Sequence, residues 1–185
     1  MKNKQILGFT GLIASGKGSA CKYLIEKYGA VPVRFSTPLR DVLDRLYLEQ
    51  SRDNLQLISK ILRENFGQDL LAKIITGDIE KIKNDLLVVD GIRRPDDIKY
   101  LRHLKNFLLV AVDTDIKIRF KRVRSRTQNT DDQGKSWEEF LEEEKGETEL
   151  YIPELIKQAD ITINNNGQRE EMFQQLDNLM KEING

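Results

Sequence analysis

The segment Gly-Leu-Ile-Ala-Ser-Gly-Lys-Gly-Ser at residues 11–19 has the composition of a phosphate-binding loop. Glycines allow successive backbone N–H groups to point at one centre, the N-terminus of a following helix adds partial positive charge, and the lysine reaches terminal phosphates. Residues 5–10 before the loop form an apolar run typical of a buried strand, which is the context this motif requires. We therefore predict that the chain binds ATP. The predicted contacts are Gly11, Ala14, Ser15, Gly16, Lys17, Gly18 and Ser19.

Lys17 is followed by Gly18 and only then by a hydroxyl residue, Ser19. In the common form of this loop, Ser or Thr follows the lysine directly. We predict that Ser19 supplies the hydroxyl nearest to Mg²⁺ and the phosphates. The alternative is that Ser19 only caps the first turn of a helix.

A second group of candidate residues follows the apolar run at 86–89. Asp90 ends this run, and Gly-Ile-Arg-Arg-Pro comes directly after it. A carboxylate at the carboxyl end of a buried strand beside a phosphate loop can hold magnesium, usually through water. We predict a catalytic, metal-holding role for Asp90 and a phosphate-clamping role for Arg93. The structural alternative is that Asp90 starts a turn and Pro95 opens the next helix.

A predicted helix ends in the basic segment 119–126. Residues three and four apart share one face of a helix, which places Arg119, Arg122 and Arg126 on the same side. Phosphoryl transfer spreads negative charge over the moving group, and planar guanidinium groups are suited to neutralise it. We predict catalytic roles for Arg122 and Arg126. The alternative is a solvated helix end that complements the helix dipole.

Residues 36–41 read Ser-Thr-Pro-Leu-Arg-Asp, in which Thr37 as a cap and the proline after it predict the start of a helix. Arg40 then lies near the helix N-terminus on the carboxyl side of the sheet. We predict that Arg40 and Ser36 contact the phosphate of an acceptor, and that Arg63 lines the same pocket. A surface position beside acidic neighbours is the open alternative for Arg40.

The composition is that of a compact enzyme whose charges balance, so the molecule has no overall electrostatic field. The 185 residues carry 30 basic and 30 acidic side chains, so we expect neither nucleic acid nor an anionic membrane as a partner. The first apolar run is too short for a signal peptide or a membrane span, and we expect a cytoplasmic protein. The single cysteine, Cys21, excludes a disulfide within the chain and is predicted to be a small core residue.

Short apolar runs alternate with longer segments of helical period, which predicts an α/β fold with a parallel sheet flanked by helices. The five expected strands are residues 5–10, 31–35, 86–90, 107–112 and 160–163. A long helical stretch, with breaks near residues 49–53 and at Gly67, separates the second strand from the third.

These elements suggest one P-loop kinase domain with two insertions. The core comprises residues 1–37, 84–121 and 151–185, the acceptor-binding helical region is 38–83, and the lid is 122–150. In the lid, Trp137 and Leu141 share one helical face and are expected to pack lightly on the body. A closed lid would exclude water, which competes with the acceptor.

The order of these motifs resembles the nucleoside monophosphate kinase group, and within it the adenylate kinase-related and dephospho-CoA kinase-like proteins. The segments that carry the resemblance are the Gly-Lys-Gly loop, FSTPLR, VVDGIRRPDD, RFKRVRSR and the tail at residues 159–167. The resemblance implies a five-stranded parallel P-loop fold. It also implies a loop beside the adenine that contains Asn164 and Gly167.

The predicted function is transfer of the ATP γ-phosphoryl group, with Mg²⁺, to a small phosphorylated acceptor. True dephospho-CoA kinases carry an aspartate-centred acceptor motif where this chain has FSTPLR, and this departure favours a nucleoside or deoxynucleoside monophosphate. Two alternatives stay open: a dephospho-CoA kinase-like enzyme, and a P-loop ATPase or nucleotide switch that acts on a macromolecular partner.

Overall fold

The structure, a computed structural model, describes residues 4–125 and 134–184. The strands are β1 (Gln5–Thr10), β2 (Val31–Arg34), β3 (Leu86–Asp90), β4 (Phe107–Asp113) and β5 (Ile161–Asn164). The helices are α1 (Lys17–Tyr28), α2 (Thr37–Arg45), α3 (Arg52–Phe66), α4 (Leu70–Lys81), α5 (Pro95–Ile98), the short 3₁₀ helix η1 (Leu101–His103), α6 (Ile116–Ser125), α7 (Trp137–Glu144), α8 (Ile152–Lys157) and α9 (Arg169–Asn184). Across these described residues, no helix has both the length and the apolar character that a bilayer span requires.

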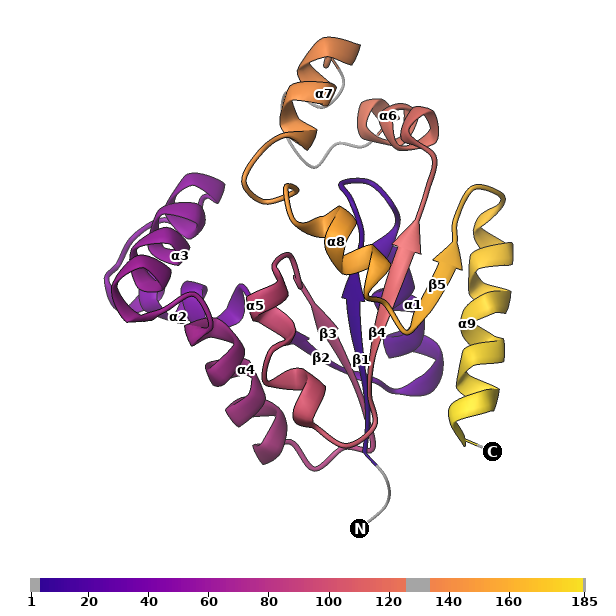
Figure 1. The fold of residues 1–185 in the computed structure, drawn as a ribbon, viewed down its shortest axis with the longest axis horizontal. Helices are drawn as coiled ribbons and strands as arrows, with labels where there is room; N and C mark the ends of the chain where they lie inside the picture. Colours follow the sequence, from indigo (N-terminus) through magenta and orange to yellow (C-terminus); the bar gives the residue numbers. More distant parts are fainter. Residues whose placement is uncertain (1–3, 126–133, 185) are drawn as a thin grey trace.

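The strands form one parallel sheet in the order β2-β3-β1-β4-β5, with β1 at its centre (Figure 1). In the register of this sheet, Leu7 of β1 lies opposite Val88 of β3 and Leu108 of β4. Because the strands are parallel, their carboxyl ends meet at one edge, where ligands of open α/β sheets bind. The prediction of a five-stranded parallel α/β fold is confirmed.

Both faces of the sheet are covered by helices, which explains why its strands are continuous apolar runs. Ile6 packs into a core with side chains of α4, α5 and α8. Leu7 and Phe9 of the same strand point to the opposite face and pack with α1 and α9. Cys21 lies in this second core as predicted, and burial raises the pKa of its thiol.

The region between β2 and β3 consists of three separate helices, as the predicted breaks require. The Ser51 hydroxyl caps α3 by accepting a hydrogen bond from the Asn54 N–H at 3.3 Å. Gly67 ends α3 with a φ of 106°, a conformation that glycine adopts without strain. The predicted cap of α2 is wrong by one residue, because α2 begins at Thr37 and Ser36 occupies the cap position.

Helix α7, within the predicted lid, packs more firmly than predicted. Its fully buried residue is Phe140, and the ring centroids of Phe120 on α6 lie 5.5 Å from Phe140 and 5.1 Å from Trp137. Ser136 begins the helix with a capping box to Glu139. The expectation of light packing through Trp137 and Leu141 is therefore corrected: an aromatic cluster fixes α7 to α6 above the carboxyl edge of the sheet (Figure 1).

Candidate phosphate-binding site

The loop between β1 and α1 curls because three of its residues have positive φ. The φ angles are 147° at Gly11, 58° at Ala14 and 105° at Gly16. A Cβ atom at Gly11 would lie 2.5 Å from the Val112 carbonyl oxygen, and one at Gly16 would collide with the Asn165 amide. The glycines are therefore required both by backbone conformation and by close contacts. A backbone curled in this way presents N–H groups to an anion.

Gly11→Ala is expected to destabilise the protein by about 1–3 kcal/mol, because the new methyl group meets rigid backbone and the φ is strained. Gly18→Ala in the same segment is the matched control, since no atom lies within 4 Å of its added Cβ. Chemical denaturation measures both free energies of unfolding. Equal values for the two variants would contradict this explanation of the loop.

The half-buried Lys17 places its ammonium inside the loop. Its Nζ donates to the carbonyl oxygens of Gly11 and of Leu12, the latter at 3.0 Å. Burial lowers the pKa of Lys17 to about 8. The negative charges of Glu149 and Asp90 oppose this decrease in pKa, whereas the positive charge of Arg93 adds to it. The structure thus brings together the predicted residues Lys17, Asp90 and Arg93.

The lowered pKa of Lys17 predicts proton uptake when a triphosphate binds at alkaline pH. The free protein loses this proton as the pH rises through about 8, and nearby phosphate charge raises the pKa again. Calorimetry at pH 8.5 in two buffers of different ionisation enthalpy should show a buffer-dependent heat. At pH 7 Lys17 is already charged, and this contribution should vanish. Identical heats in both buffers at pH 8.5 would contradict the prediction.

Asp90 and Ser19 fit the requirements of a magnesium ion. Asp90 ends β3, and its charge acts on the pKa of both Lys17 and Cys21. The part of the chain that the structure describes holds no cluster of three metal-ligating side chains. Mg²⁺ needs no such cluster, because one or two protein oxygens suffice when phosphates and water complete the octahedron. A bound ion would neutralise phosphate charge, and these ligand assignments stay a prediction.

A carboxylate from outside the loop already accepts a hydrogen bond from a backbone N–H of the loop. Glu149, which is only 4% exposed, accepts a hydrogen bond from the Ile13 N–H at 2.8 Å. Its other oxygen lies 3.0 Å from Nη1 of Arg93. The loop and Arg93 therefore bind an anionic group in the arrangement that phosphate oxygens would need.

Arg119 contacts the loop from α6. Its guanidinium is 3% exposed, donates from Nε to the Thr114 carbonyl at 3.0 Å and from Nη1 to the Ile13 carbonyl at 3.4 Å, and pairs with Glu144 of α7. Arg119 was part of the predicted basic face but was not singled out. The sequence could not show that this arginine, among several on the helix, turns inward.

Arg122, also on α6, reaches the loop through Asn165. Its Nη2 donates to the Asn165 carbonyl at 2.9 Å, and the Asn165 amide donates to the Ser15 carbonyl at 2.7 Å. The Arg122 Nη1 and the Ser15 hydroxyl are buried and lack a hydrogen-bond partner among the described residues. Burial lowers the pKa of Arg122. Arg126, the second predicted catalytic arginine, lies outside the described residues.

The loop after β5 reaches the phosphate loop through a residue that the sequence did not single out. Asn164 and Gly167 were predicted, but Asn164 instead bonds within its own turn and to Gln175. The buried amide of Asn165 makes the contact to Ser15. In a run of three asparagines, no sequence signal distinguishes the one that turns inward. A contact of Asn164 and Gly167 with adenine stays a prediction.

The predicted acceptor residues do not gather at one point. Arg40 is exposed and its Nη1 lies 2.6 Å from Oε1 of Gln50. Arg63 is buried, and its Nη2 lies 2.6 Å from the Asp97 carboxylate, which in turn accepts the N–H groups of Arg93 and Arg94. Arg63 thus supports the turn that carries Arg93. The direct acceptor contacts of Arg40, Arg63 and Ser36 remain predictions.

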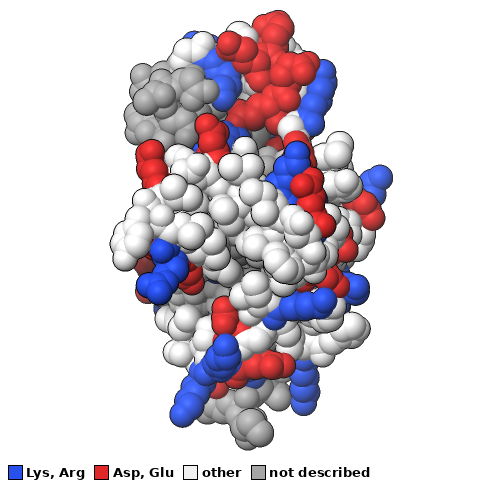
Figure 2. Space-filling model, turned by 90° about the vertical axis from the view of Figure 1, so that its left-hand side faces the viewer, with Lys and Arg blue, Asp and Glu red and all other residues white. Residues whose placement is uncertain are grey.

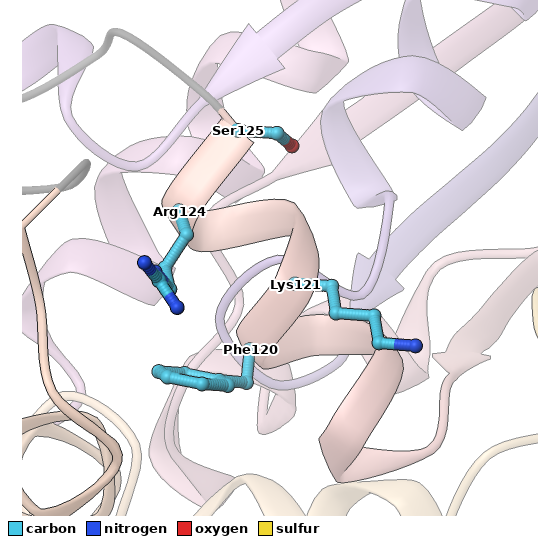
Figure 3. A pocket seen from close by; sticks show the side chains of 4 residues that line it. All are labelled: Phe120, Lys121, Arg124 and Ser125. Atoms are coloured by element: carbon cyan, nitrogen blue, oxygen red, sulfur yellow. The ribbon is translucent and has the colours of Figure 1, made fainter.

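Arg124 belongs to a different surface of α6. Figure 3 shows a hollow lined by Phe120, Lys121, Arg124 and Ser125, in which Arg124 lies on the same side as the Phe120 ring and Lys121 points away. The Arg124 guanidinium carbon is 5.8 Å from the Phe120 ring centroid. This arginine is therefore a natural control for variants of Arg122.

Comparisons with known proteins place this site in a family. The family described as the AAA domain matches residues 10–140, which include the loop, Asp90 and the basic helix. A UPF0200 protein of Thermococcus onnurineus is 31% identical over 183 residues, which cover 96% of this chain and 97% of that protein. The chain belongs to the AAA domain family and to the UPF0200 family. Another UPF0200 protein, from Methanocaldococcus jannaschii, is 30% identical over 180 residues and covers 96% and 90% of the two chains.

Solved structures share the fold of this UPF0200 chain. A shikimate kinase from Bacteroides thetaiotaomicron is similar over 98% of this chain and 99% of its own, with a TM-score of 0.63 and 14% identity. TT1252 from Thermus thermophilus is similar over 100% of both chains, with a TM-score of 0.63 and 18% identity. The fold is therefore that of P-loop kinases. The narrower resemblance to adenylate and dephospho-CoA kinases stays a prediction.

Proposed function

We propose that this UPF0200 protein is a phosphotransferase that moves the γ-phosphoryl group of ATP to a nucleoside or deoxynucleoside monophosphate. The observation that carries the proposal is an anionic group already bound at the loop: the Glu149 carboxylate accepts from the Ile13 N–H and from Arg93, and its charge acts on the pKa of Lys17. A site that holds a carboxylate in this way has the donors that a phosphoryl group needs.

The catalytic work of such a site is positioning and neutralisation of charge rather than covalent chemistry. Lys17 and the loop amides hold the donor phosphates, and Arg122 approaches from the flank through its contact with Asn165. Arg93, on the turn after β3, is suited to hold the acceptor beside the donor. Mg²⁺ between Asp90, Ser19 and the phosphates would supply further neutralisation when bound.

The proposed acceptor is a phosphorylated molecule because its site would carry arginines. Arg93 and Arg94 lie in the turn between β3 and α5, and Arg40 lies in the first turn of α2. Guanidinium groups bind phosphate in a bidentate manner, whereas a neutral hydroxyl acceptor would not need them. Similar folds occur in a shikimate kinase and a sugar kinase, so shikimate, a carboxylate without a phosphate group, and sugars, which carry no charge, are the acceptors to test against.

The test is ADP release in a coupled assay across a panel of acceptors. The panel contains ribo- and deoxyribonucleoside monophosphates, dephospho-CoA, shikimate and simple sugars. We expect release to rise with at least one monophosphate and the product to carry the transferred phosphoryl group. Stimulation by dephospho-CoA alone, or by an acceptor without phosphate (shikimate or a sugar) alone, would replace the proposed substrate. Release that no acceptor changes would favour an ATPase or nucleotide switch.

A further inference from the structure

Four glutamates of one short segment meet the basic groups that surround the phosphate loop. We name residues 143–149, the end of α7 and the turn after it, the acidic strap. Figure 2 shows acidic side chains gathered at the upper end of the molecule, where Figure 1 places α7. The strap glutamates are Glu143, Glu144, Glu147 and Glu149.

Each strap glutamate pairs with a basic residue of another element. Glu143 lies 3.2 Å from Arg52 of α3, and Glu144 pairs with Arg119 of α6. Glu147 pairs with Arg94, and Glu149 lies 3.0 Å from Arg93. The strap thus neutralises arginines that come from the acceptor-binding region, from the turn after β3 and from the helix that leads into the lid.

Glu149 differs from the other three because it reaches the loop itself. Its oxygens are shared between the Ile13 N–H and Arg93, and among the charged groups it has the largest effect on the pKa of Lys17. An anion that binds these donors must displace the carboxylate. Two negative groups so close together would repel each other strongly in a partly buried site.

We infer that Glu149 is an internal competitor of the ligand's phosphates, which holds the loop and Arg93 in the absence of nucleotide and leaves when ATP binds. The inference rests on the proposed function only in that the loop binds a triphosphate. A protein whose binding-competent state is a minor fraction shows an affinity reduced by that fraction. The strap therefore lowers the apparent affinity for ATP and couples its binding to movement of the turn after α7.

Removing the competing charge tests the inference. We expect Glu149→Gln and Glu149→Ala to bind ATP about tenfold more tightly than the wild type, because a charge-assisted contact no longer has to be broken. Tripolyphosphate, which has no base or sugar, should gain a similar factor. Calorimetry without acceptor measures these affinities. Glu142→Gln is the matched control, because Glu142 lies next to the strap but is exposed and pairs with Lys145.

A second measurement needs no variant. The turn is held by hydrogen bonds from the N–H groups of Glu149 and Leu150 to the Gly146 carbonyl, at 2.9 and 3.1 Å. Adding ATP to the wild-type protein should speed hydrogen exchange of these amides while it slows exchange in the phosphate loop. Slower exchange in both segments would overturn the inference.

The outcomes separate this inference from the proposed function. Equal or weaker binding of ATP by both Glu149 variants overturns the competitor role but leaves the kinase proposal, which turnover with an acceptor judges independently. Tighter binding by the Glu149 variants with unchanged binding by Glu142→Gln supports the role, whatever the acceptor proves to be. If neither the wild type nor any variant binds ATP, the proposed nucleotide site fails and the inference fails with it.

Discussion

Lys17→Ala is expected to lower ATP turnover by about 10³-fold and to weaken ATP binding. The ammonium donates to the Gly11 and Leu12 carbonyls, at the base of a loop whose amides would surround the phosphates. Steady-state assays and calorimetry on the same preparation measure the two effects.

Lys22→Ala is the control for this variant. Lys22 lies one turn further along α1 and forms only an exposed pair with Glu26 at 3.6 Å. The Lys22→Ala substitution removes the same charge from the same helix, and it should change neither turnover nor affinity for ATP. Turnover by Lys17→Ala at the wild-type level, with a folded protein shown by circular dichroism, would remove the central role given to the loop.

Arg122→Ala is expected to lower turnover by about 10³-fold while ATP affinity changes only a few-fold. An arginine that neutralises the moving phosphoryl group acts mainly in the transition state, so its loss should appear in kcat. The buried Nη1 without a partner among the described residues is the structural sign that this side chain awaits a ligand. Rate and binding measurements at saturating and limiting ATP separate the two quantities.

Arg124→Ala should leave turnover unchanged, because this guanidinium lies over the Phe120 ring on another side of α6. A purely structural role of Arg122 would show as a lower free energy of unfolding with the rate per folded molecule retained. That pattern, or equal losses in Arg122→Ala and Arg124→Ala, would contradict the catalytic assignment. The proposed role of Arg126 is independent of this comparison.

Much of the fold could be predicted because its signals are local. The three central strands are short apolar runs buried on both faces, and Gly67 and the polar residues near Ser51 separate the helices in the expected places. The loop was predictable because glycine and lysine at fixed spacing have few other uses. The sheet order was not predicted, since it depends on pairings between distant strands.

The parts of the site that the sequence missed are long-range contacts of common residue types. Glu149 lies 136 positions from Ile13 in the sequence. It belongs to an acidic run in which every glutamate is predicted equally well as a solvated surface residue. Asn165 is one of three successive asparagines, and only packing decides that its amide turns toward Ser15. Arg63 was assigned to the acceptor pocket by residue type, whereas it pairs with the buried Asp97.

The most direct test of the central claim is a crystal structure with Mg²⁺ and a bisubstrate analogue, two nucleosides joined by a polyphosphate. We predict phosphate oxygens within hydrogen-bonding distance of Lys17 Nζ and the Ile13 N–H, Arg122 in contact with the phosphate chain, and Glu149 displaced. A polyphosphate bound away from the loop, with Lys17 still on the Gly11 and Leu12 carbonyls and Glu149 still on Ile13, would contradict the account.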